Sequence, residues 1–310
     1  MTKVLGFDIG GTKIEAGLLD ETGREWRTLR EPTPARREDL LQTVVTMAEA
    51  LGRGVAVAAV GFAIPGSLDP RTGLLRNAPN SPQINETPFG CDLRERINRP
   101  LFFDNDANCL VRSEVRFGIA RGYDHVVGII MGTGLGAGVL SGGRMIQGWR
   151  GLAPEPGHTV LHHHGRACLC GNRGCAEAYL SGTSIYARYR EAGGQPLAGK
   201  AKDVFARRET NPIAGVVVEE TLDLFARFTA GLIALYDPAL IVLGGGVSEQ
   251  VTYYRQESAI AAYAFGTDEV PPIRAAGLGP TSGKLGAAAL ALDGSAPVSS
   301  AGSDPSAGRF

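Results

Sequence analysis

The sequence predicts an α/β protein of two domains, and three observations support this prediction. The chain has 310 residues, which is more than a single hydrophobic core usually holds. Hydrophobic residues make up 44% of the chain and charged residues 20%, so a sizeable core can form. A strand, a glycine loop and a second strand follow one another twice, at 3–19 and again at 126–146. The chain is therefore expected to contain two halves of related layout.

Hydrophobic periodicity defines the elements of the first half. Apolar runs of strand length alternate there with apolar residues at helical spacing. The expected elements are strands at 3–9, 13–19, 55–64 and 101–103 and helices at 39–51 and 107–117. A stretch at 77–88, rich in proline and asparagine, has no clear period and predicts a long loop of the kind that often carries function.

The second half repeats the pattern and then continues into longer helices. Its expected elements are strands at 126–131, 139–146 and 240–243, a glycine loop at 132–138 and helices at 213–236 and 283–292. We expect residues 1–117 with 283–294 to form the first domain and 118–282 the second. Residues 295–310 are rich in Ser, Ala, Pro and Gly, which predicts a disordered tail.

Charge and hydropathy exclude several classes of partner. With 31 basic and 32 acidic residues the formal net charge is -1, which offers no footprint for nucleic acid. No apolar stretch approaches the roughly 20 residues that span a bilayer, and the N-terminus lacks a signal-peptide pattern. No membrane partner is expected, and the cytoplasm is the expected location.

The two glycine loops are candidate phosphate sites. A glycine-rich turn lets backbone N–H groups approach phosphate oxygens, and Thr12 and Thr133 add hydroxyl donors. Asp8, at the end of the strand before the first loop, is placed to hold hydrated magnesium. The alternatives are two tight hairpins without a ligand and a turn role for Asp8. A dinucleotide fingerprint is disfavoured, because its glycines must lie between a strand and a helix.

An acidic cluster lies at a predicted strand-to-helix corner. Asp104, Asn105 and Asp106 follow the strand at 101–103 and precede a helix. Phosphoryl transfer needs a group that accepts the hydroxyl proton, and one carboxylate suffices. Aspartate is also a favoured N-cap residue, so Asp106 or Asp104 could simply cap the helix. Local sequence alone favours the capping role.

Three of the five cysteines are crowded together. Cys168, Cys170 and Cys175 suit a tetrahedral zinc site in a reducing compartment better than a disulfide framework. Cys91 and Cys109 are expected to be buried free thiols. The run at 162–164 offers three histidines as competing ligands, but a surface loop is the preferred interpretation.

Six motifs, in order, resemble those of the ROK sugar kinases. They are DIGGTK at 8–13, IPGSLD at 64–69, DNDANC at 104–109, GTGLGAG at 132–138, CLCGNRGC at 168–175 and LGGG at 243–246. The resemblance runs from Val4 to about Leu292. It implies an actin-like ATPase (ribonuclease H-like) fold, with a cleft between two α/β domains for ATP and sugar, and a homodimer. ROK repressors carry an N-terminal helix-turn-helix domain, for which the phosphate loop starting at Asp8 leaves no room.

The resemblance also implies roles for particular residues. Asp106 matches the general base, and Asn105 matches a residue that holds a sugar hydroxyl. The sugar pocket would comprise Gly66, Ser67, Asn80, Asn105, Asp106, Glu155, His158 and Glu177. The ATP site would comprise Asp8, Gly10, Gly11, Thr12, Lys13, Gly132, Thr133, Gly134, Gly244, Gly245 and Gly246. His158 would complete the zinc site with the three cysteines, and Asp8 would bind magnesium in its outer sphere.

The segment around Glu155 departs from the family pattern. That pattern is Gly-Glu-x-Gly-His, whereas Pro154 and Pro156 flank Glu155 here. Because Pro156 lacks an N–H group and biases Glu155 toward an extended conformation, the loop is expected to differ in shape.

The predicted function is transfer of the ATP γ-phosphate to a hexose hydroxyl, with the 6-hydroxyl expected as the acceptor. The stretches at 65–80 and 264–272 resemble bacterial fructokinases and mannokinases, so a fructose- or mannose-type hexose is expected first. N-acetylglucosamine kinase and glucokinase are close alternatives. A non-catalytic sugar sensor of the same fold is the alternative from another class, although the intact Asp8, Asp106 and glycine loops argue against it.

Overall fold

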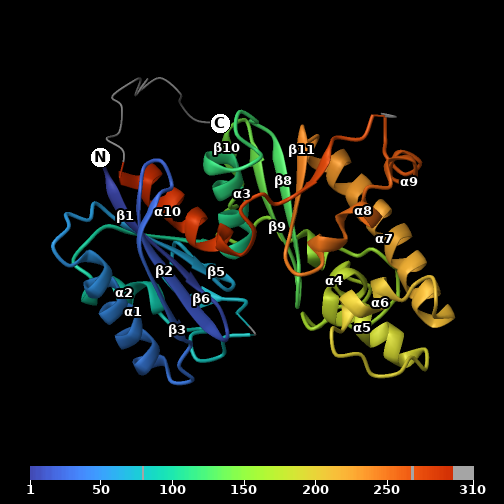
Figure 1. The fold of residues 1–310 in the computed structure, drawn as a ribbon, viewed down its shortest axis with the longest axis horizontal. Coiled ribbons are helices and arrows are strands. Elements are labelled where there is room, and N and C mark those ends of the chain that lie inside the picture. The colour runs from blue at the N-terminus through green and yellow to red at the C-terminus, as the bar shows by residue number, and fades with distance from the viewer. Residues whose placement is uncertain (79, 267–268, 296–310) are drawn as a thin grey trace.

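The protein consists of two α/β domains that lie side by side (Figure 1). The computed structural model describes residues 1–78, 80–266 and 269–295. The first five-stranded sheet has the order β3-β2-β1-β4-β7 and the second β10-β9-β8-β11-β12. In each sheet the first three strands pair antiparallel and the remaining two pairings are parallel. The two sheets thus share one topology, which confirms the repeated layout.

The first domain holds the N-terminal sheet, with α1 and α2 on one face and α3 and α10 on the other (Figure 1). Its strands are β1 (Lys3–Ile9), β2 (Lys13–Asp20), β3 (Glu25–Pro32), β4 (Val60–Ile64) and β7 (Leu101–Asn105), with the small hairpin β5 (Ser67–Leu68) and β6 (Leu75–Arg76) beside them. Its helices are α1 (Arg37–Gly52), α2 (Phe89–Arg96), α3 (Asp106–Phe117) and α10 (Ser282–Ser295).

The second domain is built on the second sheet and carries the longest helix. Its strands are β8 (Val126–Met131), β9 (Leu135–Ser141), β10 (Arg144–Met145), β11 (Leu240–Gly244) and β12 (Ile273–Ala275). Its helices are α4 (Glu177–Leu180), α5 (Gly182–Glu191), α6 (Ala201–Ala206), α7 (Pro212–Tyr236), α8 (Val251–Tyr254) and α9 (Glu257–Ala261). Short 3₁₀ turns occur at Pro156–His158, Ser248–Gln250 and Gly279–Thr281. None of the helices in the described ranges has the length and hydrophobicity needed to cross a bilayer.

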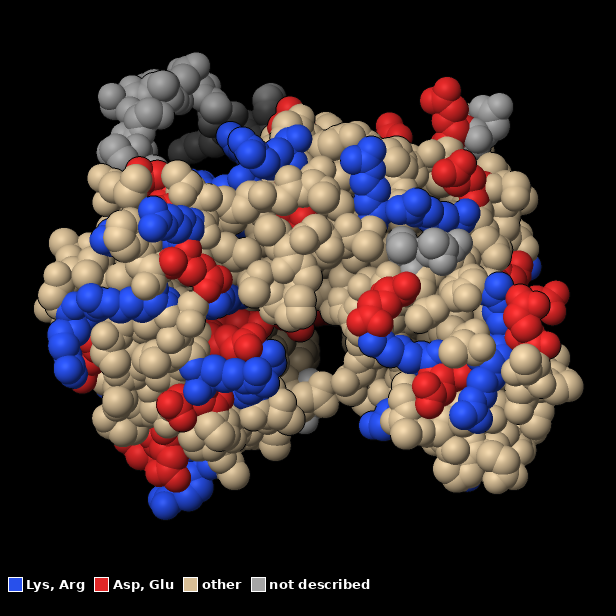
Figure 2. Space-filling model, viewed as in Figure 1, with Lys and Arg blue, Asp and Glu red and all other residues tan. Residues whose placement is uncertain are grey.

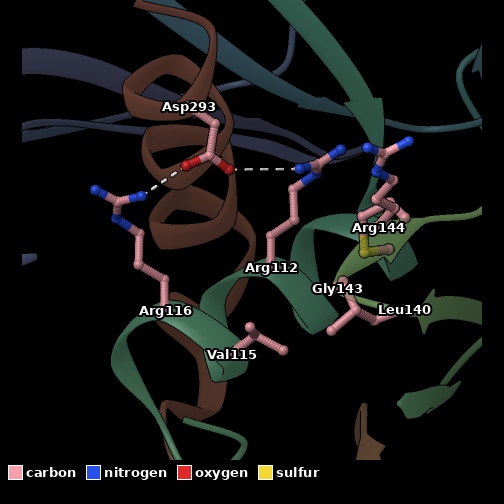
Figure 3. A pocket seen from close by; sticks show the side chains of 8 residues that line it. Arg112, Val115, Arg116, Leu140, Gly143, Arg144 and Asp293 are labelled. Carbon is pink, nitrogen blue, oxygen red and sulfur yellow. Dashed lines mark hydrogen bonds and ion pairs between the residues drawn. The ribbon is translucent and has the colours of Figure 1, made fainter. Parts of the chain in front are cut away.

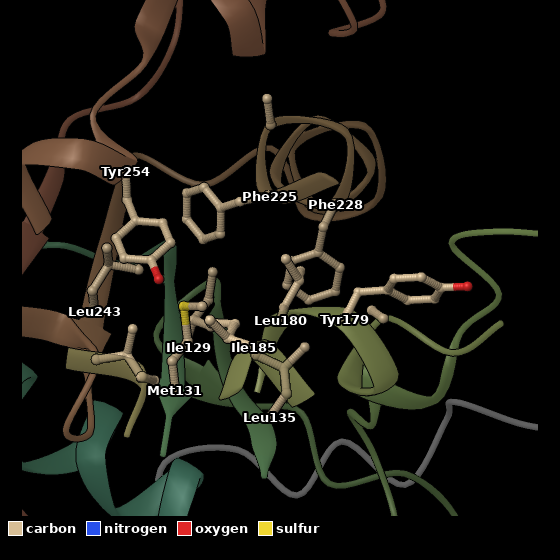
Figure 4. Close-up of a cluster of buried hydrophobic side chains, with 14 of the residues drawn as sticks. Ile129, Met131, Leu135, Tyr179, Leu180, Ile185, Phe225, Phe228, Leu243 and Tyr254 are labelled. Atoms are coloured by element: carbon tan, nitrogen blue, oxygen red, sulfur yellow. The ribbon is translucent and has the colours of Figure 1, made fainter. Parts of the chain in front are cut away.

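The core of the second domain forms where α7 and the small helices cover β8 and β11 (Figure 4). Phe225 of α7 meets the ring of Tyr254 edge to face, with ring centroids 4.6 Å apart. Ile129 and Met131 of β8 and Leu243 of β11 are fully or almost fully buried below them. This packing fixes the ends of β8 and β11, from which the second glycine loop and the Gly244–Gly246 turn emerge.

Helix α10 packs closely on the first sheet because two strands offer glycines to it. A Cβ atom at Gly6 of β1 would overlap the carbonyl of Lys284, and one at Gly61 of β4 would overlap that of Ala287. On its other side, α10 presents Gly286 to the carbonyl of Cys109 in α3. These contacts join β1, β4, α10 and α3 into one rigid unit.

Several predicted element bounds were wrong. The strand expected at 55–64 begins only at Val60, and the preceding residues pack against the core without strand pairing. The glycine loop expected at 132–138 ends at 134, because β9 already begins at Leu135. Strand β3 was not predicted, since most of its residues are exposed and give no apolar alternation. The predicted tail lies outside the described residues except for Ser295, with which α10 ends.

Candidate active site

A deep hollow separates the two halves of the molecule, and acidic side chains line part of its wall (Figure 2). The strand-to-helix corner between β7 and α3 supplies the central acid, Asp106. Asp106 is exposed to solvent on one side, while protein atoms surround its carboxyl group on the other sides. Asp106 Oδ1 accepts a hydrogen bond from the backbone N–H of Ala107 at 2.8 Å. Its second oxygen accepts no side-chain hydrogen bond in the described part of the chain and so is free for a ligand.

Asn105, rather than either aspartate, caps α3. Its Oδ1 accepts a hydrogen bond from the backbone N–H of Asn108 at 2.8 Å. The alternative that Asp106 or Asp104 caps this helix does not hold, since Asn105 is the residue with extended backbone directly before the first turn. The cap uses only Oδ1, and the side-chain N–H₂ group of Asn105 donates no hydrogen bond within the described residues, so it can donate to a ligand.

Buried Asp104 holds the corner in place through both oxygens. Oδ1 accepts from the backbone of Asn105 at 3.0 Å and from Asn108 Nδ2 at 2.7 Å. Oδ2 accepts from Arg112 Nε at 3.0 Å and from Gln147 Nε2, in the second domain, at 3.1 Å. Sequence reasoning missed both partners of Oδ2. The i, i+4, i+8 spacing of Asp104, Asn108 and Arg112 was the available signal for Arg112, whereas nothing local marks Gln147.

Five carboxylates share one electrostatic neighbourhood. Desolvation raises the pKa of Asp106, and desolvation followed by the charges of Asp106 and Glu15 raises that of Asp8 to about 6. The pKa of Glu155 rises to about 7, mainly by desolvation and further by Asp106 and Glu177. Such clustered, shifted acids are typical of functional sites and favour a bound cation or hydroxyl ligands.

Asp8 is the penultimate residue of β1, just before the first glycine loop. The first turn of α10 leaves room for its carboxylate only because residue 283 is glycine, since a Cβ atom at this position would overlap Asp8. Lys13 also lies close enough to lower the pKa of Asp8, while its Nζ pairs with Glu15 at 2.9 Å. Asp8 is therefore the carboxylate beside the first glycine loop that would hold a hydrated magnesium ion.

Replacing Asp8 by Asn is expected to stabilise the ligand-free protein at neutral pH. The folded-state pKa of about 6 lies above the ordinary value of 3.8, so the folded state binds more protons than the unfolded state between these values. Stability from this group is present below about pH 4 and is lost as pH rises through 6, a cost of about 1–3 kcal/mol at pH 7. Denaturant unfolding of Asp8→Asn at pH 5 and 7.5 measures the gain.

Asp69→Asn is the matched control for this measurement, because its expected effect has the opposite sign. Hydrogen bonds from Arg71 lower the pKa of Asp69 to about 2. Its contribution is present above the unfolded-state pKa and is lost as pH falls through 2, so the substitution should lower stability at pH 7.5. A destabilised Asp8→Asn protein at pH 7.5 would contradict the proposed cost of the Asp8 charge.

The first glycine loop is a tight turn that lies against the predicted sugar loop. The backbone N–H of Gly10 donates to the carbonyl of Lys13 at 2.9 Å, and the carbonyl of Thr12 accepts from Thr33 at 3.1 Å. A Cβ at Gly11 would contact the carbonyl of Asn80 at 2.5 Å. The loop is thus close-packed on the chain that follows residue 79, and the phosphate and sugar loops adjoin.

Glu177 joins the second glycine loop to the cysteine-rich segment at 168–175. Glu177 Oε2 accepts a hydrogen bond from the backbone of Leu135 at 3.0 Å and lies against Gly134, where a Cβ would leave too little room. Gly132 closes the turn by donating to the carbonyl of Gly134 at 3.0 Å. One oxygen of Glu177 is therefore occupied by the loop. Thr133 is exposed at the tip.

The Gly244–Gly246 turn lies beside this loop at the end of β8. Gly245, with φ of +86°, packs against the carbonyl of Met131, which also accepts from the backbone of Val247 at 3.0 Å. Because Met131 directly precedes Gly132, the third glycine segment and the second glycine loop are neighbours, as a nucleotide site shared between them requires.

Four side chains form a cluster that fits zinc. The ligand atoms of His158, Cys168, Cys170 and Cys175 all lie within 4.8 Å of one another. Cys168 Sγ is 3.6 Å from His158 Nδ1, and Cys170 Sγ is 3.6 Å from Cys175 Sγ. Zinc–sulfur bonds of about 2.3 Å in a tetrahedron place sulfur atoms just under 4 Å apart, so the cluster matches.

The other cysteines and histidines of the sequence lie outside this cluster. The histidines at 162–164 are exposed, as expected for a surface loop. Cys109 is buried as predicted, but Cys91 is exposed on α2, so its predicted burial was wrong. Cys91 follows the buried pair Phe89 and Gly90 and so falls on the solvent side of the helix.

The proline-flanked segment brings Glu155 to the site. Pro156 starts a 3₁₀ turn, and Gly157 packs directly on the carbonyl of Leu135 at the start of β9. Glu155 has φ of -123° and ψ of 59°, which lies outside helical geometry. The resulting position puts Glu155 within electrostatic reach of Asp106 and Glu177.

The opposite wall of the predicted sugar pocket is less closely tied to the acids. Gly66 has φ of +75° and packs on Arg76 and Asn77 across the turn, and Ser67 is buried in β5. Asn80 is exposed. Within the described ranges, no hydrogen bond joins these residues to Asp106 or Glu155.

Two α/β domains of one sheet topology, each with a strand–glycine–strand loop, define the actin-like ATPase fold. The chain belongs to the ROK family, whose sequence profile matches residues 4–294.

Three relatives illustrate this membership. The chain is 34% identical over 302 residues to N-acetyl-D-glucosamine kinase of Pasteurella multocida, covering 93% of this chain and 98% of the relative. It superposes on the ROK hexokinase of Thermus thermophilus with a TM-score of 0.86 and 35% identity, over 94% and 99% of the two chains. A ROK glucokinase of Streptomyces griseus, solved with glucose and AMPPNP, gives a TM-score of 0.78 and 30% identity with the same coverage.

Proposed function

We propose that this protein transfers the γ-phosphate of ATP to the 6-hydroxyl of a hexose, with Asp106 as the general base. The observation that carries the proposal is the Asp106 carboxylate itself. It has one oxygen without a side-chain partner, a raised pKa and two further acids, Asp8 and Glu155, in its electrostatic neighbourhood.

The chemistry follows from this placement. As the sugar oxygen bonds to the γ-phosphorus and the bond to the bridging β–γ oxygen breaks, the hydroxyl proton passes to Asp106. Because burial raises the pKa of Asp106, its carboxylate is a stronger base than an exposed aspartate. The Asn105 N–H₂ group and the carboxyls of Glu155 and Glu177 are placed to orient neighbouring hydroxyls. A magnesium ion, when bound near Asp8, would neutralise phosphate charge.

We further propose that zinc bound by His158 and the three cysteines pins the segment that carries Glu155 and Glu177. Cys168 Sγ lies 3.9 Å from Glu177 Oε1, and Glu177 in turn accepts a hydrogen bond from the second glycine loop. The cluster therefore supports both the sugar side and the phosphate side of the site. A homodimer is proposed by family analogy.

The hexose is proposed to be of the fructose or mannose type, on the resemblance of residues 65–80 and 264–272. Glucose and N-acetylglucosamine form the second candidate, because relatives 30–34% identical are named for these sugars. Specificity for one hexose over another depends on one or two hydrogen bonds between the pocket and the sugar, because hexoses differ little from one another.

A sugar panel tests this proposal. ADP release is measured with magnesium-ATP and glucose, fructose, mannose, N-acetylglucosamine or N-acetylmannosamine. The highest kcat/KM is expected with fructose or mannose, and a preference for glucose or N-acetylglucosamine would establish the second candidate. Absence of sugar-dependent ADP release with every sugar would favour a non-catalytic sensor.

A further inference from the structure

A cavity of about 370 Å³ lies between α3, α10 and the β9–β10 hairpin, outside the site described above. Three arginines line it: Arg112 and Arg116, one turn apart on α3, and Arg144 on β10 (Figure 3). The acidic residue of the lining is Asp293, near the end of α10. Both domains therefore contribute to the walls.

The carboxylate of Asp293 uses only part of the available positive charge. Its Oδ1 lies 2.6 Å from Arg116 and its Oδ2 3.6 Å from Arg112 (Figure 3). Arg116 Nε is buried without a hydrogen-bond partner, and Arg144 is exposed with no ion pair in the described part of the chain. The lining thus holds three guanidinium groups and one carboxylate, and because buried Asp104 offsets the charge of Arg112, the excess positive charge rests mainly on Arg144.

Two further acids lie near this cavity but do not line it. Asp104 is buried on the side of the catalytic corner, where it accepts a hydrogen bond from Arg112 Nε. Asp124 is next to the hairpin, where its backbone carbonyl accepts from Gly143 at 3.0 Å and its Oδ1 lies 3.6 Å from the position of a Cβ at Gly143. The guanidinium group of exposed Arg144, which forms no ion pair among the described residues, stays available to a ligand.

We propose that this cavity binds a small phosphate-bearing dianion. The planar guanidinium fork of Arg144 matches two phosphate oxygens, and a phosphate group would supply the acidic partner that this arginine lacks among the described residues. The apolar side chains of Val115 and Leu140 complete the wall and suit the carbon part of a phosphate ester. The volume lies within the range of small-molecule sites. None of the glycine-loop residues is part of this lining, so the site is separate from the ATP phosphate site.

The cavity also contacts the catalytic corner through one residue. Arg112 lines it and donates to Asp104, whose other oxygen binds the backbone of Asn105. The binding test below does not depend on turnover, so its outcome is independent of the proposed sugar kinase activity.

Calorimetric titration with inorganic phosphate and with glycerol 2-phosphate tests the proposal. The full chain is first saturated with magnesium, sugar and a nonhydrolysable ATP analogue, so that the glycine loops are occupied. One equivalent of either anion is expected to bind, with the ester at least as tight as inorganic phosphate. Arg144→Glu should weaken binding about 10- to 100-fold, because a charge-assisted contact is replaced by repulsion.

Arg121→Glu, which alters an exposed arginine outside the cavity lining, serves as the matched control and should bind as the unaltered protein does. Basal turnover and the thermal midpoint show that each variant is folded. No binding to the saturated wild-type protein, or equal binding to Arg144→Glu, would overturn the proposal.

Discussion

Replacing Asp106 by Asn is expected to lower kcat about 10²- to 10⁴-fold, the usual contribution of a general base. The amide cannot accept the sugar proton but keeps the size of the carboxylate and its hydrogen bond from Ala107. The fold should persist, because Asn105 rather than Asp106 caps α3. Turnover under saturating sugar and ATP measures the loss, and calorimetry measures sugar affinity, which should be largely retained.

Asp124→Asn is the matched control for this experiment, because Asp124 is exposed and follows the loop after α3. Its kcat should equal that of the unaltered protein. Near-normal turnover of Asp106→Asn would show that another group takes the proton. A loss of turnover together with a lowered thermal midpoint would instead point to a structural role.

Replacing Cys170 by Ser is expected to release the bound zinc, lower the thermal midpoint by about 5–10 °C and raise the KM for the sugar. Structural zinc contributes about 10–16 kcal/mol of apparent binding energy in small peptides, so losing a ligand removes a large constraint. Because Glu177 contacts both Cys168 and the second glycine loop, the loosened segment would disturb two parts of the site.

Cys91→Ser controls for thiol loss as such, since Cys91 is exposed on α2 and is not among the four clustered ligands. It should keep full metal content and an unchanged midpoint. Elemental analysis that finds about one zinc per chain in the unaltered protein and none in Cys170→Ser would support the site. Active protein that contains no zinc would refute it.

The repeated strand–loop–strand pattern was enough to predict two related sheets, because buried strands carry continuous apolar runs such as Val126–Met131. The edges of the sheets were harder to predict. Strand β3 pairs along the whole of β2 yet exposes most of its side chains, so its pairing with β2 holds it in place without an apolar pattern. Val55 and Val57 show the opposite case, because they are apolar and pack on the core but pair with no strand.

Residue type and sequence position were enough to predict which four residues form the metal-ligand cluster. They were also enough to group three acids, because Asp8 and Glu155 each lie within electrostatic reach of Asp106. What the sequence did not reveal depends on tertiary contacts. The anchoring of Asp104 by Gln147 joins residues 43 positions apart, and the assignment of the cap to Asn105 depends on where α3 begins.

The glycine contacts around α3 imply how the molecule can move. The first turn of this helix touches β9 at Gly138, and its middle touches α10 at Gly286. A helix held so closely by both domains lies on the natural pivot between them. We expect Asp106, at its first residue, to stay nearly stationary relative to the first glycine loop during closure, because β1 and α3 belong to one rigid unit, while the Glu155 segment moves toward it. The base would then act as the fixed point against which the two substrates are aligned.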